Sequence, residues 1–62
     1  MTGYIIAHVD TGEKVAIAID HITVVAPTRD GRFLRIYTDD NDFTDVTESF
    51  DDVMEAIEVK AR

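Results

Sequence analysis

The sequence predicts an α+β fold, in which a bent antiparallel sheet of three to five strands is followed by one C-terminal amphipathic helix packed on it. Two observations support this prediction. Short stretches of aromatic and β-branched residues, separated by turn residues, fill the first part of the chain, whereas apolar residues recur with helical spacing from Phe50 onward. The 62 residues fit a single domain, 1–62, near the lower size limit for a self-sufficient core.

The first predicted strand is Tyr4–Val9, which ends at the turn residues Asp10–Glu13. A second apolar stretch covers residues 15–26, but its large apolar side chains switch from odd to even positions at Asp20-His21. Because side chains alternate with a period of two along a strand, one face can continue only if a residue is inserted or the chain bends. We therefore expect a bulge or a corner near Asp20-His21. The residues expected to share one face beyond it are Ile22, Val24 and Ala26.

The next predicted strand is Phe33–Thr38. Pro27 ends the preceding stretch because proline has no N–H to donate, and Asp30-Gly31 is a strong signal for a hairpin turn. A polar turn at residues 39–42 then leads to a short further strand at residues 43–46.

The C-terminal helix is predicted to begin at Ser49. Serine is a favoured N-cap, and Asp52 lies three residues later, in a variant of the capping box. Acidic residues in the first turn, and Lys60 and Arg62 at the far end, suit the helix dipole. The apolar stripe comprises Phe50, Val53, Met54 and Ile57. The residues expected on the solvent side are Glu48, Asp51, Asp52, Glu55 and Glu58.

Carboxylates are concentrated between Asp39 and Glu58, where nine occur without any Lys or Arg. The helix explains those from Glu48 onward. The four that remain without a structural explanation are Asp39, Asp40, Asp42 and Asp45. The net charge of −7 disfavours direct binding to nucleic acid, since the only basic cluster is small. It comprises Arg29, Arg32 and Arg35.

The sequence also argues against a membrane protein. No apolar run approaches the roughly 20 residues that span a bilayer, and the N-terminal segment lacks the basic and apolar regions of a signal peptide. We therefore expect a cytoplasmic protein that makes no direct contact with membranes or nucleic acid.

Three patterns would permit a specific chemistry, and each has a simpler interpretation. Asp10-Thr11-Gly12 is the tripeptide of aspartic proteases, which need two such aspartates, but it is also an ordinary hairpin turn. Asp40-x-Asp42-x-Thr44 begins like a calcium loop, yet Asp45 stands where an EF-hand needs glycine. His8 and His21 lack a defined third ligand for zinc. We therefore expect no enzyme, no cofactor and no metal site.

Surplus aromatic and apolar residues are a better indication of function. One helix shields one face of a sheet, so several such residues are left for the other face or an edge. Exposed aromatic clusters often mark protein–protein contacts, although a curled sheet would also bury them. Together with the unexplained carboxylates, the candidate interaction residues are Tyr4, Val25, Phe33, Tyr37, Asp39, Asp40, Asp42 and Asp45.

Two segments together resemble a known family. Residues 15–25 form a strand, an Asp-His-Ile corner and a second strand, and residues 46–53 match the pattern V-x-E-S-x-x-x-V at the start of a final helix. Both are similar to the FlbD-like flagellar proteins and to comparable short phage-type proteins. The resemblance implies a compact β-meander closed by a C-terminal helix, with a non-enzymatic, regulatory role and no catalytic residues.

The predicted function is therefore a small non-enzymatic interaction or regulatory module that acts through protein–protein contacts. Because small scaffolds often gain stability by association, we expect a homodimer or a higher homo-oligomer. The alternative is an acidic mimic of nucleic acid that occupies a basic groove on a partner protein, as the uninterrupted run of carboxylates indicates.

Overall fold

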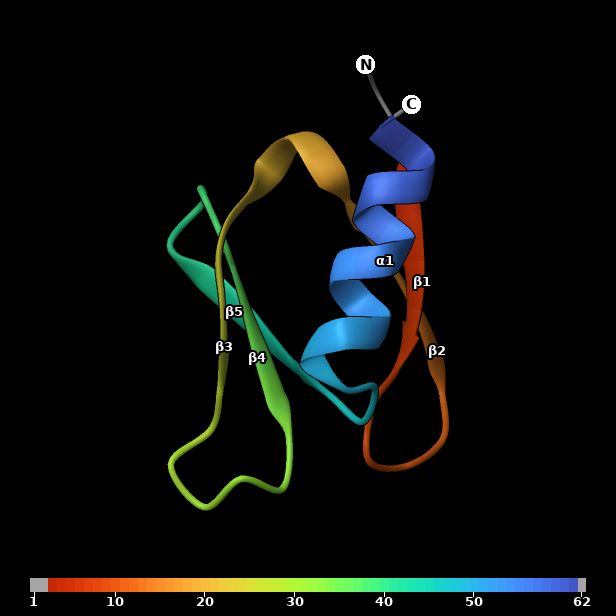
Figure 1. Ribbon diagram of the computed structural model, residues 1–62. Coiled ribbons are helices and arrows are strands. Elements are labelled where there is room, and N and C mark those ends of the chain that lie inside the picture. Colours follow the sequence, from red (N-terminus) through yellow and green to blue (C-terminus); the bar gives the residue numbers. More distant parts are fainter. Residues whose placement is uncertain (1–2, 62) are drawn as a thin grey trace.

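The computed structural model describes residues 3–61 and has an α+β fold (Figure 1). Within this range, five strands, one 3₁₀ turn and one helix follow one another. They are β1 (Tyr4–His8), β2 (Lys14–Ala18), η1 (Ile19–His21), β3 (Ile22–Pro27), β4 (Leu34–Thr38), β5 (Asp42–Val46) and α1 (Phe50–Ala61). The predicted fold class is confirmed. The strands, however, form two antiparallel sheets, in the orders β1-β2 and β3-β4-β5.

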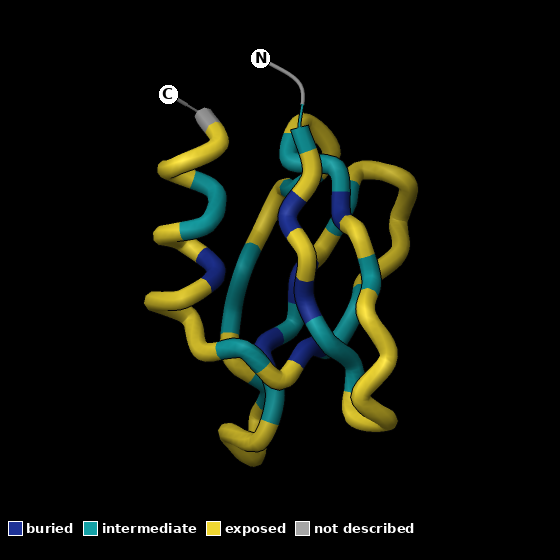
Figure 2. The backbone as a smooth tube through the Cα atoms, turned by 90° about the vertical axis from the view of Figure 1, so that its right-hand side faces the viewer, coloured by how far each residue is buried: buried dark blue, intermediate teal, exposed yellow. Residues whose placement is uncertain are grey.

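The hairpin β1-β2 and the three-stranded sheet lie on either side of a small core, and α1 lies across the gap between β1 and β3 (Figures 1 and 2). Seven residues of the described chain form this core, and all are aliphatic. They are Ile5, Ala7, Ile17, Leu34, Ile36, Val46 and Val53. The inner faces of both sheets and one side of α1 therefore share a single core.

The chain turns between the two sheets at η1, at the corner that the change of parity predicts. The pairing of β3 with β4 then shifts register between Ile22 and Val24. Ile22 and Val25 consequently pack against the core, whereas Val24 is 51% exposed. The prediction that Ile22, Val24 and Ala26 share one face was wrong, because the extra residue lies inside β3 and reverses the alternation after Ile22.

Helix α1 is capped as predicted by Ser49. The Asp52 N–H donates to Ser49 Oγ at 3.1 Å, and the Val53 N–H donates to the Ser49 carbonyl at 3.0 Å. Val53 is buried, but Phe50 is 47% exposed and Met54 is 38% exposed. The apolar stripe is therefore only partly covered. No helix in residues 3–61 has the length and apolar character needed to cross a membrane, and Arg62 lies outside the described residues.

The end of β1 is tied to the segment between β5 and α1. The Thr47 N–H donates to the His8 carbonyl at 2.8 Å, and the His8 N–H donates to Glu48 Oε1 at 2.9 Å. His8 Nδ1 lies 2.6 Å from Glu48 Oε2, so the tautomer with a proton on Nδ1 donates a second bond. Glu48 was expected on the solvent side of the helix. It instead precedes α1 and joins the hairpin to the second sheet.

The pKa of Glu48 reflects this arrangement. Burial of the carboxylate raises its pKa, but the hydrogen bonds from the His8 ring and the His8 N–H together outweigh that effect, and the pKa lies below its usual value. A carboxylate whose pKa is lowered by folding stabilises the native state above its unfolded pKa. That contribution is lost as the pH falls through the lowered value.

We predict that Glu48→Gln lowers the free energy of unfolding by about 1–2 kcal/mol at pH 7, because a charged acceptor of two hydrogen bonds is lost. The difference between native and variant proteins should shrink as the pH falls below the usual glutamate pKa of about 4.3 and Glu48 becomes protonated in the native protein. Urea unfolding at several pH values measures both effects. Glu55→Gln, an exposed position on α1, is the control and should keep the native pH profile. A Glu48 variant with that same profile would contradict the assignment.

Candidate functional site

None of the aromatic side chains belongs to the core. The chain has two tyrosines and three phenylalanines, and all five lie within the described residues. Tyr4, Tyr37, Phe43 and Phe50 are between 38% and 59% exposed, and Phe33 is half-buried. Aromatic residues carry much of the apolar area of a small protein. Their positions therefore leave large apolar surfaces exposed outside the core.

Two of these aromatics share the face of the three-stranded sheet that points away from the core. Val24 pairs with Tyr37, and Tyr37 pairs with Phe43, across the three strands. The next row on the same face pairs Ala26 with Arg35 and Arg35 with Asp45. We call this surface the outer sheet face. Its residues are Val24, Ala26, Arg35, Tyr37, Phe43 and Asp45.

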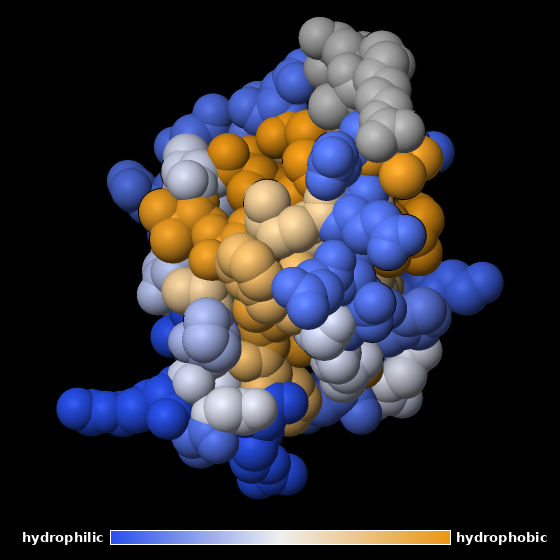
Figure 3. Space-filling view, in the orientation of Figure 1, coloured by the Kyte–Doolittle hydropathy of each residue, from blue (hydrophilic) through white to orange (hydrophobic). Residues whose placement is uncertain are grey.

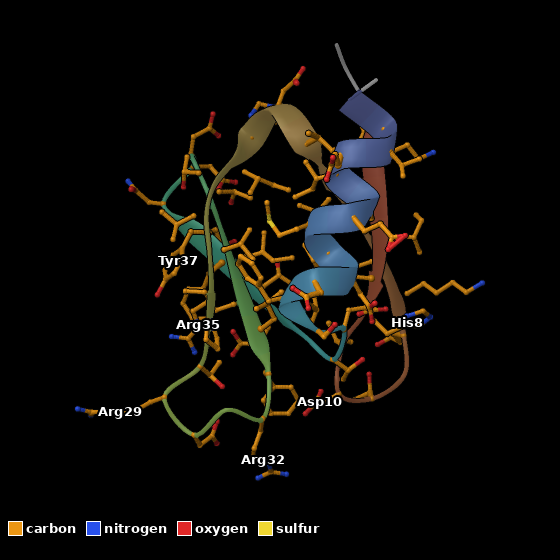
Figure 4. All side chains as sticks on the ribbon, in the orientation of Figure 1. His8, Asp10, Arg29, Arg32, Arg35 and Tyr37 are labelled. Atoms are coloured by element: carbon orange, nitrogen blue, oxygen red, sulfur yellow. The ribbon has the colours of Figure 1, made fainter. Side chains whose placement is uncertain are left out.

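Arg35 organises the centre of the outer sheet face. Its Nε donates to Asp45 Oδ1 at 2.8 Å and its Nη2 donates to Asp45 Oδ2 at 3.0 Å, so the pair is bidentate. The guanidinium carbon lies 4.1 Å from the centre of the Phe43 ring, and the Tyr37 and Phe43 ring centres are 6.0 Å apart. Figure 4 shows Arg35 and Tyr37 next to each other on this sheet. Hydrogen bonding from Arg35 lowers the pKa of Asp45.

The acidic turn between β4 and β5 forms one end of this face. Asp39 accepts from His21 Nδ1 at 3.0 Å, and Asp40 accepts from the Thr38 hydroxyl at 2.5 Å, which lowers the pKa of Asp40. Asp42 accepts from the Phe43 N–H at 2.8 Å. The four carboxylates that the sequence left unexplained, Asp45 included, thus all accept hydrogen bonds from their own turn, strands or corner.

The loop between β3 and β4 forms the opposite end and carries positive charge. Asp30 shapes this loop by accepting from the Thr28 hydroxyl at 2.8 Å and from the Arg32 N–H at 3.1 Å. Figure 4 shows Arg29 and Arg32 extending from the loop. The Arg32 guanidinium carbon lies 5.7 Å from the centre of the Phe33 ring. The outer sheet face therefore has a basic end and an acidic end.

The structure gathers most of the predicted interaction residues around the outer sheet face but separates two of them. Tyr37 and Asp45 lie on the face. The turn residues Asp39 and Asp40 and the first residue of β5, Asp42, lie at its acidic end, and Phe33 lies at its basic end. Tyr4 is exposed on the hairpin instead. Val25 was expected on the outer face or an edge, but it packs against the core because of the shifted register in β3.

Sequence reasoning missed Val24, Arg35 and Phe43 on this face. The position of Phe43 opposite Tyr37 depends on the β4-β5 turn, in which Asn41 has a φ of 65°. A short turn of this kind pairs the residues on either side of it. Tyr37 and Phe43 could have been matched by counting outward from Asp40, the middle residue of the three-residue turn 39–41.

The residues considered for catalysis or metal binding form a turn or make hydrogen bonds with other side chains. The Asp10-Thr11-Gly12 segment is a turn, closed by hydrogen bonds from the Gly12 N–H to the Val9 carbonyl and from the Val9 N–H to the Glu13 carbonyl. His8 contacts Glu48 and His21 contacts Asp39, in two separate places. Residues 3–61 contain no group of three or more histidine, aspartate or glutamate side chains able to hold a metal ion.

Comparisons with known proteins do not add to this geometry. No protein-family model matches the sequence, and searches of curated proteins and of solved structures give no match. A functional interpretation therefore depends on the surfaces of the molecule itself.

The Arg35–Asp45 pair gives a direct test of the outer sheet face. We expect the Asp45 carboxyl to titrate below the usual aspartate value of about 3.9, and to return towards that value in Arg35→Gln. Carboxyl-carbon chemical shifts followed by NMR during an acid titration measure this directly. Arg29→Gln, in the loop, is the control and should leave the Asp45 titration unchanged. An Asp45 pKa at or above about 3.9 in the native protein would show that the pair does not form in solution.

Proposed function

We propose that this chain is a cytoplasmic, non-enzymatic protein-interaction module that associates with a second copy of itself through the outer sheet face. The observation that carries the proposal is the contiguous patch of Val24, Tyr37 and Phe43 on a sheet face that no other described element covers. Tyrosine, phenylalanine and arginine are enriched in protein–protein interfaces, and this patch contains all three.

The exposure of the patch supports this proposal. Val24, Tyr37 and Phe43 are 51%, 38% and 47% exposed. Association is also one of the routes by which a small core without cysteine gains extra stability.

The charges at the two ends of the face favour one arrangement of the copies. A two-fold axis that runs across the strands makes β4 of one copy antiparallel to β4 of the other. The basic loop of each copy, with Arg29 and Arg32, then lies over the acidic turn of the other copy, with Asp39 and Asp40. A two-fold axis along the strands would instead place like charges together, which is unfavourable.

The expected dimer is weak. Three strands spaced about 4.8 Å apart and about 17 Å long form a contact area well below that of a standard interface, which buries about 800 Å² per partner. We therefore expect a dissociation constant in the micromolar range or above. Such an association is concentration-dependent and suits a regulatory module.

The acidic nucleic-acid mimic stays an alternative prediction. This alternative was based on the four carboxylates that the sequence left unexplained. In the structure, each of them accepts a hydrogen bond within the molecule. Their positions therefore follow from local structure without a basic partner, and self-association is the better supported proposal.

We predict that the native protein sediments with an increasing average mass between about 10 µM and about 1 mM, and that Phe43→Ser remains a monomer over this range. Phe43 is 47% exposed, so its replacement removes contact area without opening a cavity. Ile6→Ser is the matched control, because Ile6 is 58% exposed on the hairpin. It should associate like the native protein. Equal loss of association in both variants would contradict the assignment to the outer sheet face.

A charge exchange tests the arrangement of the copies in the same measurement. Arg29→Glu with Arg32→Glu gives one variant, and Asp39→Lys with Asp40→Lys gives another. Each alone should be monomeric, since like charges then face each other, whereas an equimolar mixture should dimerise. Both variants keep a net negative charge because the native chain carries −7, so net charge alone does not attract them. A mixture that stays monomeric would refute the antiparallel arrangement.

A further inference from the structure

A second apolar surface lies on the other side of β3, between this strand and α1. It is a groove formed on one side by the corner and the strand and on the other by the helix. We call it the helix–strand groove, and its lining residues are Ile19, Ile22, Thr23, Val25, Phe50, Met54 and Ile57. Figure 3 shows a hydrophobic band across the face of the molecule that carries α1. The residues that line the groove include no charged side chain.

The groove is open because α1 covers β3 incompletely. Only Val53 of the helix is buried among the described residues, while Phe50 and Met54, on the side towards β3, are 47% and 38% exposed. Both belong to the apolar stripe of an amphipathic helix, whose side chains are normally covered by the element beneath it. On the β3 side, the apolar stripe of α1 is therefore still accessible to the apolar side chains of another segment.

The backbone of β3 is available along the same groove. β3 is an edge strand of its sheet, and it pairs with β4 only. The Thr28 N–H donates to the Phe33 carbonyl, which makes Thr28 and Phe33 a hydrogen-bonded pair. In an antiparallel ladder such pairs alternate with pairs that make no mutual bonds, so the N–H and carbonyl of Val25 point away from β4. Pro27 has no N–H and limits further pairing towards the loop.

The surroundings of the groove are negatively charged. Asp51 follows Phe50 on α1 and Asp20 follows Ile19 in η1, and both carboxylates are exposed. The chain as a whole carries −7. A second copy of the chain would bring the same negative charge to this site, whereas a positively charged segment would be attracted to it.

We propose that the helix–strand groove binds an extended peptide segment in which apolar side chains alternate with Lys or Arg, and that this segment pairs with β3 as a fourth strand. The apolar side chains enter the groove against Met54 and Ile57, and the alternate, cationic side chains point to the opposite face of the sheet and stay in solvent. Backbone hydrogen bonds to Val25 fix the direction of the segment, as in other cases of strand addition. This site is separate from the outer sheet face and does not depend on self-association.

The test uses three synthetic peptides with blocked ends, (Lys-Val)₄, (Lys-Ser)₄ and (Glu-Val)₄, titrated into ¹⁵N-labelled protein and followed by NMR. We expect (Lys-Val)₄ to bind at least about tenfold more tightly than the other two, because only it satisfies both the apolar groove and the negative surroundings. Amide shifts should be largest in β3 and in the half of α1 that faces it. Equal binding of (Lys-Val)₄ and (Lys-Ser)₄ would overturn the proposal, because charge alone would then explain the binding.

Two variants of the same charge locate the site. Met54→Lys places an ammonium group in the groove and should weaken (Lys-Val)₄ binding at least about tenfold. Val59→Lys changes the net charge equally but lies on the side of α1 towards β1, where Val59 is 59% exposed, and should bind like the native protein. Equal effects of the two variants would overturn the proposal. Shifts of β3 and α1 signals on dilution of the protein alone would instead assign the groove to a second copy.

Methylation of the peptide nitrogens tests strand addition. Two forms of (Lys-Val)₄ carry N-methyl groups on the lysines or on the valines. Because only alternate amides of an added strand face its neighbour, one form should lose binding and the other should keep it. Equal affinity of both forms would exclude pairing with β3.

Discussion

The junction between His8 and the Thr47–Glu48 segment is the contact on which the rest of the structure depends. It joins residues 39 and 40 positions apart, and four hydrogen bonds from or to His8 hold the end of β1 at the point where β5 leads into α1. The hairpin is thereby fixed against the inner face of the second sheet, and α1 is directed across the gap between them. All three elements are used to cover one core. In the described chain, nothing is left to cover the outer sheet face.

This constraint also explains where the aromatic residues lie. The core is a set of seven aliphatic side chains, and no aromatic ring is among them. Tyr37 and Phe43 consequently lie on the outer sheet face, and Phe50 lies at the helix–strand groove. β3 separates these two surfaces, since Val24 belongs to one and Val25 to the other. The one-residue register shift in β3 therefore determines which side chains lie on the outer sheet face and which line the helix–strand groove.

The sequence was sufficient for features that depend on neighbours along the chain. Ser49 and Asp52 identified the start of the helix, and the change of parity at Asp20-His21 identified the corner. Features set by distant pairing were not predictable in this way. The position of the bulge in β3 is determined by its pairing with β4, so Val24 and Val25 were assigned to the wrong faces. The contact between His8 and Glu48 has no local signal, and Glu48 was therefore assigned to the helix surface.

The central claim is that the outer sheet face of one molecule contacts the outer sheet face of another. The most direct test is an isotope-filtered NOE experiment on a concentrated equal mixture of ¹³C-labelled and unlabelled protein, which detects contacts between copies only. We expect intermolecular NOEs between the methyl groups of Val24 and the rings of Tyr37 or Phe43, with intensities that fall on dilution. Intermolecular NOEs confined to Tyr4 and Ile6 on the hairpin, or none at millimolar concentration, would contradict it.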